Sequence, residues 1–309
     1  MPSAVVFAYH NVGVRCLSVL LAQGVRVLLV VTHEDKPDET IWFDSVWKLA
    51  RAHALPVISP QDPNTADMLA RLKALGPDFL FSFYYRHMLG AALLAVPGHG
   101  AYNMHGSLLP RYRGRVPVNW AVIMGERETG ATLHQMVAKP DAGGIVGQQA
   151  VPIGPDETAL QVFNKVSDAA GQLLERVLPA LMDGTAPIIP QDLGKGSYFG
   201  GRRPEDGRIG WSKSALEVHN LVRGVAPPYP GAFTQLGDKP LRVLRARPTT
   251  ADKAANTRPA IRAAGKRCIA TCGDGSELEL LEMELNGKPF TSADFLAVFG
   301  DDPVPLPLQ

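Results

Sequence analysis

Short apolar segments alternate with helical patterns through the first half of the chain, and this alternation limits the available folds more than any other feature. The apolar segments are Val5–Ala8, Val27–Thr32, Pro56–Ile58, Phe79–Phe83 and Gly100–Met104. Helical spacing of apolar residues predicts the helices Arg15–Leu21, Ser45–His53 and Ala66–Leu75. Strands that are apolar on both faces and separated by helices are typical of a mainly parallel sheet. The sequence therefore predicts a Rossmann-like α/β domain with helices on both faces of the sheet.

The second half of the chain predicts the end of this domain and the start of a smaller one. Thr129–Val137 and Gly144–Val151 predict an additional pair of strands, and Ala159–Leu181 predicts a long helix that closes the domain. The stretch Thr185–Gly210 is rich in glycine, proline and charge, which is typical of a linker. A helix near Ser214–Gly224 follows, and the strands predicted after it are Ala232–Leu236, Leu241–Ala246, Cys268–Thr271 and Glu277–Glu284. We therefore expect a catalytic domain at residues 1–204 and a small OB-like β-barrel domain at residues 205–309.

Composition and charge exclude several classes of protein. The 309 residues are 46% hydrophobic and 20% charged, as in an ordinary globular protein large enough for two domains. Cys16, Cys268 and Cys272 are too few for a disulfide framework, and the N-terminus lacks the basic start of a signal peptide. So few cysteines suit a reducing cytosol, so we expect a cytoplasmic protein. We expect no membrane association, because runs such as Val27–Val31 are too short to span a bilayer. A net charge of +1 argues against extensive nucleic-acid binding, which needs a basic surface.

The densest cluster of polar residues lies at Asn103–Arg115, directly after a predicted strand. Side chains two apart on a strand share a face, so Asn103 and His105 should point together over the crevice at the carboxyl end of the sheet. An amide donor beside a base that titrates near neutrality suits acyl transfer to an amine. An isolated Asn-x-His pair would favour a plainer interpretation, a turn cap and a satisfied backbone group. The motifs around Asn103 and His105 favour the catalytic interpretation instead.

Several motifs of fixed spacing follow one another in order around this cluster. They are Asn103-x-His105, Ser107-Leu108-Leu109-Pro110, Tyr112-Arg113-Gly114, Thr129-Gly130-Ala131-Thr132-Leu133-His134 and Asp141-Ala142-Gly143-Gly144-Ile145. Over residues 1–250 the chain resembles the folate-dependent formyltransferases, a family that includes methionyl-tRNA formyltransferase, glycinamide ribonucleotide transformylase and the sugar-nucleotide N-formyltransferases. The resemblance implies an enzyme that transfers a formyl group from 10-formyltetrahydrofolate to an amine.

Four further segments are similar to one branch of this family. They are Phe7–His10, Phe81–His87, Arg113–Trp120 and Phe199–Pro204. They resemble the formyltransferase half of the bifunctional polymyxin-resistance protein, which formylates UDP-4-amino-4-deoxy-L-arabinose for lipid A modification. At the position of Arg115 the tRNA enzymes usually have a small residue. The resemblance therefore implies that the partner is a small nucleotide sugar and not a nucleic acid.

The resemblance also implies roles for individual residues. Asn103 would donate a hydrogen bond to the formyl oxygen, His105 would take the proton of the attacking amine, and Asp141 would orient the imidazole and favour its protonated form. Without the family, Asp141 would be a turn residue, because Pro140–Gly144 has ordinary turn chemistry. The implied folate contacts are His87, Met88, Leu89, Arg115, Val137, Ala138, Lys139, Pro140 and Asp141. The implied acceptor contacts are Tyr9, Ser107, Arg113, Phe199 and Arg202, and no metal is implied.

Alternative interpretations stay open at this point. The chain could instead formylate methionyl-tRNA, which its near-neutral charge disfavours, or be a non-catalytic folate- or nucleotide-binding protein, which the complete catalytic set disfavours. A minor hydrolase alternative would place a metal ion among His87, His105, His134 and Asp141. Packing against the core and contact with the pterin explain the apolar Met88 equally well. Arg115 taken alone would be a solvated surface charge. The nucleotide base, the sugar and the oligomeric state do not follow from the sequence.

Overall fold

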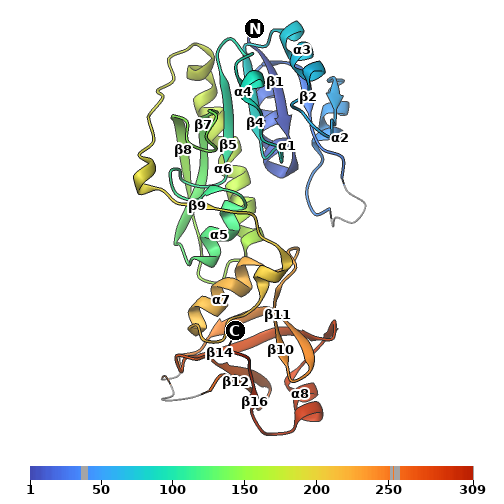
Figure 1. Cartoon of the computed structure of the whole chain (residues 1–309), viewed down its shortest axis with the longest axis vertical. Helices are drawn as coiled ribbons and strands as arrows, with labels where there is room; N and C mark the ends of the chain where they lie inside the picture. Colours follow the sequence, from blue (N-terminus) through green and yellow to red (C-terminus); the bar gives the residue numbers. More distant parts are fainter. Residues whose placement is uncertain (36–40, 251–252, 254–257, 309) are drawn as a thin grey trace. The chain divides into compact units, whose positions relative to one another are not determined.

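The computed structural model describes residues 1–35, 41–250, 253 and 258–308, and the chain folds into two compact units (Figure 1). The first unit consists of Met1–Pro117, Glu128–Pro152 and Phe163–Gly200, and the second of Val118–Arg127, Ile153–Val162 and Gly201–Gln309. Two short segments from the first part of the chain therefore belong to the second unit. None of the described helices is long and apolar enough to cross a membrane.

A seven-stranded sheet forms the framework of the first unit, with the strand order β3-β2-β1-β4-β5-β7-β8. The strands are β1 Ser3–Ala8, β2 Arg26–Val31, β3 Val57–Ile58, β4 Phe79–Phe83, β5 Ala101–His105, β7 Glu128–Gln135 and β8 Ile145–Pro152. The first five pair in parallel, whereas β7 runs antiparallel to both β5 and β8. The predicted α/β class with a mainly parallel sheet is therefore confirmed, and the additional pair of strands is present.

Helices cover both faces of this sheet, which explains why its strands are apolar throughout. The helices are α1 His10–Ala22, α2 Val46–Ala52, α3 Ala66–Leu75, α4 Ala91–Leu94 and α6 Ala159–Met182, whose first residues belong to the second unit. Val5 and Phe7 of β1 share a core cluster with Met68 and Leu72 of α3. Val6 lies between them and is equally buried, so it faces the opposite layer.

An antiparallel sheet curls into a half-barrel in the second unit, with the order β10-β11-β14-β13-β12-β16 and with β15 paired to β14 (Figure 1). The strands are β10 Ala232–Leu236, β11 Lys239–Pro248, β12 Ala260–Ala264, β13 Arg267–Thr271, β14 Glu277–Leu285, β15 Lys288–Pro289 and β16 Val304–Pro305. Trp211 is fully buried in the core of this unit, and its indole N–H donates to the Thr234 hydroxyl at 2.9 Å. The expected small β domain is present as an open half-barrel, because its end strands β10 and β16 do not pair within the described residues.

Helix α7 (Ala215–Gly224) explains why two short segments from the first part of the chain join this unit. The guanidinium of Arg223 donates to the carbonyl oxygens of Gly154 and Glu157 at 3.2 and 3.1 Å. The side-chain amide of Asn119 donates to the last carbonyl of the helix at 2.9 Å. Buried backbone carbonyls need such partners, so these contacts attach both segments to α7.

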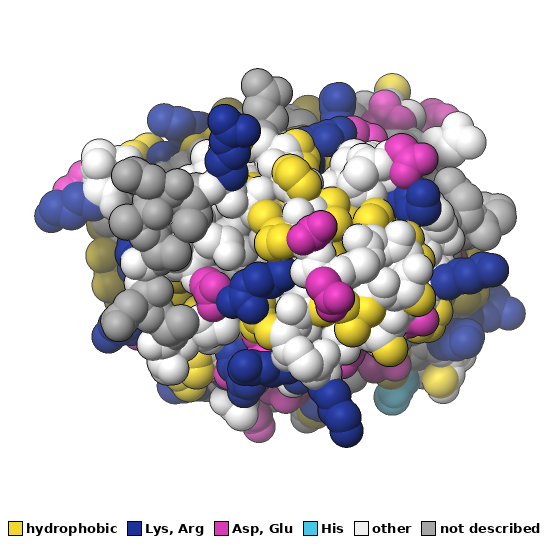
Figure 2. Space-filling view, turned by 90° about the horizontal axis from the view of Figure 1, so that it is seen from below, with side chains coloured by type: hydrophobic (Ala, Val, Ile, Leu, Met, Phe, Trp, Pro, Cys, Tyr) yellow, Lys and Arg dark blue, Asp and Glu magenta, His cyan; other side chains and the backbone are white. Residues whose placement is uncertain are grey.

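Charged side chains on the half-barrel neutralise one another across neighbouring strands. The pairs between β11 and β14 are Arg242–Glu284 at 2.7 Å, Arg245–Glu282 at 2.8 Å and Arg247–Glu279 at 3.2 Å. Figure 2 shows a face of the molecule on which Lys and Arg side chains are interspersed with Asp and Glu around a hydrophobic area. Partly exposed pairs of this kind add little stability, but they leave these three arginines without excess positive charge.

The structure also contains elements that the sequence patterns do not predict. They include helix α5 (Pro117–Ile123), helix α8 (Ser292–Phe299), and strands β6 (Arg113–Gly114) and β9 (Tyr198–Phe199), which pair in parallel. Helix α4 and strands β12, β15 and β16 are also not predicted. A signal for α8 is present in the sequence, because Thr291 and Asp294 form a capping box at its start. No local pattern reveals the pairing of β6 with β9, because the two strands lie far apart along the chain.

Candidate active site

Strands β5 and β7 carry the central side chains of the candidate site. Asn103 and His105 lie on β5, and their partners across the antiparallel pair are His134 and Thr132, respectively. The amide nitrogen Nδ2 of Asn103 lies 3.1 Å from Nε2 of His134. Residues directly opposite each other on paired strands are neighbours. The register of the sheet therefore brings an amide and two imidazoles together.

The His105 ring is buried, and one hydrogen bond determines where its proton lies. Nε2 is 2.8 Å from the carbonyl oxygen of Tyr112, which can only accept, so Nε2 carries the proton of the neutral ring. Nδ1 then holds a lone pair, and it lies 3.6 Å from Oδ1 of Asp141. Burial lowers the pKa of His105, although the Asp141 charge and the Tyr112 carbonyl act in the opposite direction. The ring is therefore a neutral base whose free nitrogen faces a carboxylate.

Asp141 lies in the loop between β7 and β8, in the left-handed region with a φ of 51°. Its Oδ1 lies 3.6 Å from His105 Nδ1 and 3.6 Å from His134 Nε2, and its Oδ2 accepts the N–H of Gly114 at 2.8 Å. Burial alone would raise the pKa of Asp141. The two histidines and the Gly114 amide outweigh that effect and hold the pKa well below its ordinary range. The carboxylate is therefore ionised and can stabilise a positive charge that forms on His105.

His134 belongs to this cluster, although the sequence interpretation assigns it only to the minor metal alternative. Its Nδ1 lies 2.7 Å from the carbonyl oxygen of Gln135 and therefore carries the ring proton. Nε2 is then an acceptor, and Asn103 donates to it. That contact uses one of the two amide hydrogens of Asn103 and leaves the other for a ligand. The signal in the sequence is that His134 ends a family motif, but its role depends on the register of β7 against β5.

The loop after β5 is supported by buried hydroxyl groups. Thr132 Oγ1 donates to the carbonyl oxygen of Ser107 at 2.6 Å and accepts the N–H of Leu109 at 3.2 Å. Ser107, an expected acceptor contact, is fully buried, and its hydroxyl donates to the Arg111 carbonyl at 2.7 Å. The structure thus places Ser107 inside the loop, where it supports the segment that carries the Tyr112 carbonyl.

Residues 185–199, which we call the strap, contact the loop after β5 and the loop between β7 and β8. Ser197 Oγ accepts the N–H of Tyr112 at 2.8 Å, and β9 at the end of the strap pairs with β6. The side chain of Gln191 donates to the carbonyl oxygen of Asp141 at 3.0 Å. The stretch that the sequence predicts to be a linker is therefore part of the framework of the site.

The expected folate contacts lie in two largely exposed stretches of the first unit. Met88 is 56% exposed and Val137 is 43% exposed, whereas Leu89 is buried. The ring of His87 stacks on His33 with centroids 5.0 Å apart. The remaining expected contacts, which are partly or fully exposed and lie close in sequence to Gly114 and Asp141, are Arg115, Ala138, Lys139 and Pro140.

Three of the expected acceptor contacts have partners within their own unit. The Tyr9 hydroxyl donates to Asp35 at 2.7 Å, and the Phe199 ring stacks on the Tyr112 ring with centroids 5.1 Å apart. Arg202 belongs to the second unit, where its guanidinium lies over an indole ring at 4.6 Å. Each of these side chains therefore already has a partner within the protein.

Arg113 differs from the other expected acceptor contacts. Its side chain is 9% exposed, and its Nε is buried without a hydrogen-bond partner in the described part of the chain. Its backbone lies on β6, between the Tyr112 carbonyl that contacts His105 and the Gly114 amide that contacts Asp141. A buried guanidinium next to the loop that follows β5 can pair with an anion.

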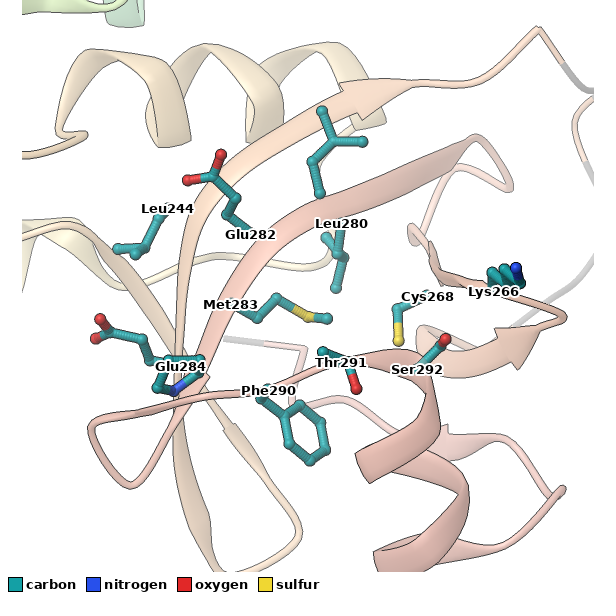
Figure 3. A pocket seen from close by; sticks show the side chains of 12 residues that line it. Leu244, Lys266, Cys268, Leu280, Glu282, Met283, Glu284, Phe290, Thr291 and Ser292 are labelled. Atoms are coloured by element: carbon teal, nitrogen blue, oxygen red, sulfur yellow. The ribbon is translucent and has the colours of Figure 1, made fainter.

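A separate pocket of about 400 Å³ lies in the second unit (Figure 3). It is lined by strands of the half-barrel and the start of α8, with Cys268, Met283 and Phe290 among the lining residues. None of the expected site residues lines it. In the described part of the chain, no three His, Cys, Asp or Glu side chains are grouped to hold a metal ion.

The structure resembles several solved enzymes. The N-formyltransferase from Helicobacter canadensis, solved with folinic acid and dTDP-3-aminofucose, is 18% identical over 94% of this chain and 100% of its own, with a TM-score of 0.72. The sugar 3N-formyltransferase WlaRD, solved with dTDP and 5-N-formyl-THF, is 17% identical over 90% of this chain and 97% of its own, with a TM-score of 0.70. HypX from Aquifex aeolicus, solved with tetrahydrofolic acid, is 16% identical over 95% of this chain but only 46% of its own, with a TM-score of 0.61. At these identities the likeness shows the fold.

Family models extend the comparison to the sequence. The model described as formyl transferase matches residues 16–178, more than half of the chain. A second model, described as formyl transferase, C-terminal domain, matches residues 202–300. The first match contains Asn103, His105, His134 and Asp141, and the second contains most of the half-barrel. The chain therefore belongs to the formyl transferase family of enzymes.

Proposed function

We propose that this enzyme transfers a formyl group from 10-formyltetrahydrofolate to the amine of a sugar nucleotide, with UDP-4-amino-4-deoxy-L-arabinose as the favoured acceptor. The observation that carries the proposal is the neutral ring of His105, whose Nδ1 lone pair lies 3.6 Å from the Asp141 carboxylate. Asn103 on the same strand supplies an amide donor. A buried base, a carboxylate that stabilises its protonated form and an amide donor are the groups that formyl transfer to an amine requires.

The proposed chemistry gives each of these groups a defined role. The bound folate supplies the formyl group, whose carbon the acceptor amine attacks. Asn103 donates its second amide hydrogen to the formyl oxygen as negative charge develops there. His105 Nδ1 takes the proton of the attacking nitrogen, and Asp141 stabilises the imidazolium. As the bond from the formyl carbon to the folate nitrogen breaks, His105 returns a proton to that nitrogen, so the products are the formylated amine and tetrahydrofolate.

We propose that the folate binds against residues 87–89, 137–141 and Arg115. These stretches are largely exposed, and the second leads directly into Asp141, so a folate there would present its formyl group to the catalytic cluster. The structures of the Helicobacter canadensis enzyme, WlaRD and HypX each contain a folate compound, which supports a folate donor for this chain as well.

The proposed acceptor is anionic because of Arg113. The Nε of this buried guanidinium has no hydrogen-bond partner in the described part of the chain. The diphosphate of a nucleotide sugar would supply both an acceptor and a counter-charge through bidentate hydrogen bonds. The partly exposed Phe199 ring offers an aromatic face for the base or the sugar, whereas Tyr9 is only 4% exposed. The choice of UDP rests on the resemblance of residues 113–120 and 199–204 to the UDP-sugar enzyme. The dTDP compounds in the Helicobacter canadensis enzyme and WlaRD make a dTDP-linked amino sugar the first variant to test.

We further propose that the two parts of the chain have different functions. Residues 1–204 bind the folate, and residues 205–309 contribute to turnover. Removing residues 205–309 would also remove the hydrogen bonds that α7 makes to Asn119, Gly154 and Glu157. A chain ending at Pro204 should therefore bind a folate analogue, melt at a lower temperature and lack turnover. Full turnover by that shortened chain would contradict the proposed division of function.

Formylation of methionyl-tRNA is the second candidate function. A tRNA ligand requires several unpaired basic groups to neutralise its phosphates. The three arginines of β11 are instead paired with glutamates of β14. A non-catalytic binding protein is a third candidate. It is disfavoured because the Asp141 carboxylate lies 3.6 Å from both His105 and His134, and Asn103 contacts His134.

Incubation with 10-formyltetrahydrofolate and a panel of acceptors, read by mass spectrometry, tests the proposal. The panel contains UDP-4-amino-4-deoxy-L-arabinose, dTDP-linked amino sugars and methionyl-tRNA, and the His105→Ala variant is the matched control. We expect one formyl group on the UDP sugar. Reaction of methionyl-tRNA alone would overturn the acceptor class, and reaction of a dTDP sugar alone would replace only the nucleotide.

A further inference from the structure

Gln191 is the strap residue that reaches the loop carrying Asp141. Its Nε2 donates to the carbonyl oxygen of Asp141 at 3.0 Å and to that of Gly143 at 2.6 Å. An amide nitrogen carries two hydrogens, so both are used on the backbone of one turn. Its Oε1 is buried and has no hydrogen-bond partner in the described part of the chain. Reversing the amide would turn that oxygen toward two carbonyl oxygens, so the donors determine its orientation.

The turn that Gln191 holds has an unfavourable backbone conformation. Asp141 has a φ of 51°, in a region that residues with a Cβ seldom adopt. Gly143 lies so close to β7 that an added Cβ would clash with the carbonyl oxygen of Gln135. Such a conformation persists only where surrounding contacts hold it in place. On the backbone of this turn, Gln191 supplies two of those contacts.

Gln191 itself is anchored independently of the catalytic residues. Two positions before it, Ile189 exchanges a pair of backbone hydrogen bonds with Ile145 at the start of β8, each 2.8 Å long. Further along the strap, Ser197 binds the backbone of Tyr112. The strap is therefore fixed at Ile189 and at Ser197. Gln191 lies between these positions and reaches the turn that carries Asp141.

We infer that Gln191 is a positioning residue that holds the Asp141 carboxylate at its distance from His105. The inference rests on the proposed formyl transfer and deepens it. Among the described residues, the one backbone group that donates to the Asp141 carboxylate is the Gly114 N–H at Oδ2. Without the two hydrogen bonds from Gln191, the turn can relax from its left-handed conformation and carry Oδ1 away from His105 Nδ1.

Replacement of Gln191 by Met tests this role, because Met has similar length but no N–H donor. The matched control is Lys195→Ala on the same strap, because Lys195 is exposed and pairs with Asp192 on the strap itself. The first measurement is the NMR titration of the His105 ring in the substrate-free protein, which needs no acceptor. Because Asp141 favours the protonated ring, the midpoint in Gln191→Met should move to lower pH, as it should in Asp141→Asn. Lys195→Ala should titrate like the wild type.

The second measurement is kinetic. In Gln191→Met, kcat should fall by about 10- to 100-fold, because small misplacements of catalytic groups have effects of that size. The acid limb of kcat/KM should move to lower pH, which a purely structural role would not cause. If Gln191→Met does not fold, Gln191→Leu provides the same test.

An unchanged His105 titration in a folded variant would overturn the inference, and so would a loss of activity that only follows a lower melting temperature. A shifted titration in a protein that formylates no nucleotide sugar would uphold the positioning role and refute the proposed function. The two failures are therefore distinguishable.

Discussion

Asp141→Asn tests whether the carboxylate acts as a charge beside His105. In the wild type, the N–H of Gly114 donates to Oδ2 at 2.8 Å. The same donor will select the amide oxygen of the new side chain, which places the amide nitrogen at the position of Oδ1, 3.6 Å from His105 Nδ1. There the amide N–H can approach the lone pair that should take the proton of the substrate. The substitution therefore removes the charge and also obstructs the base.

The separation of the two groups sets the size of the effect. At 3.6 Å, two unit charges interact by about 5 kcal/mol with an effective dielectric constant of about 20. The side chains are only 7% and 15% exposed, so solvent screening is small. The full interaction corresponds to roughly three to four orders of magnitude in rate. Because the amide keeps a polar contact with the ring, we expect kcat to fall by about 10²- to 10³-fold.

The pH profile gives the sign of the effect. His105 must be neutral to accept a proton, so kcat/KM falls as the pH drops through its pKa. Asp141 raises that pKa, and removing its charge should move the acid limb to lower pH while the plateau falls. Steady-state rates with the identified acceptor between acidic and neutral pH measure both changes. A limb that moves to higher pH, or a plateau within threefold of the wild type, would refute this account of Asp141.

The remaining predictions concern other residues and solution conditions. Asn103→Ala and His105→Ala should each leave the fold intact and lower kcat by about 10²-fold or more, and the double variant should lose less than the two effects combined. Thr132→Val removes a buried hydroxyl that contacts Ser107 and Leu109, and should lower the unfolding free energy by about 1–3 kcal/mol; an unchanged urea midpoint would contradict this. Cys16 is fully buried and burial raises the pKa of its thiol, so thiol reagents should modify it only as the protein unfolds, and rapid labelling of native protein would be inconsistent with its position. Between low and moderate salt the KM for the acceptor should change much less than the roughly 10³-fold typical of a protein with many phosphate contacts, whereas a change of that size would favour tRNA.

Local patterns in the sequence determined most of the secondary structure. Helix α3 and strand β10 have the bounds that the sequence predicts, Ala66–Leu75 and Ala232–Leu236. The α/β class followed from the same patterns, because the spacing of apolar residues shows which faces of a strand or helix are buried. The family motifs also identified Asn103, His105 and Asp141 as a set. Their roles remain the prediction that the proposed substitutions test.

Tertiary structure alone decided how these residues meet. The register of β5 against β7 places His134 beside Asn103, and a left-handed turn brings Asp141 within 3.6 Å of two imidazoles. The strap, which composition suggests is a linker, supplies Gln191 and the β6–β9 pairing. Short segments of the first part of the chain join the half-barrel unit through α7. These features depend on hydrogen bonds between residues that lie far apart along the chain. Such bonds produce no periodic pattern of apolar residues in the local sequence, so they cannot be predicted from it.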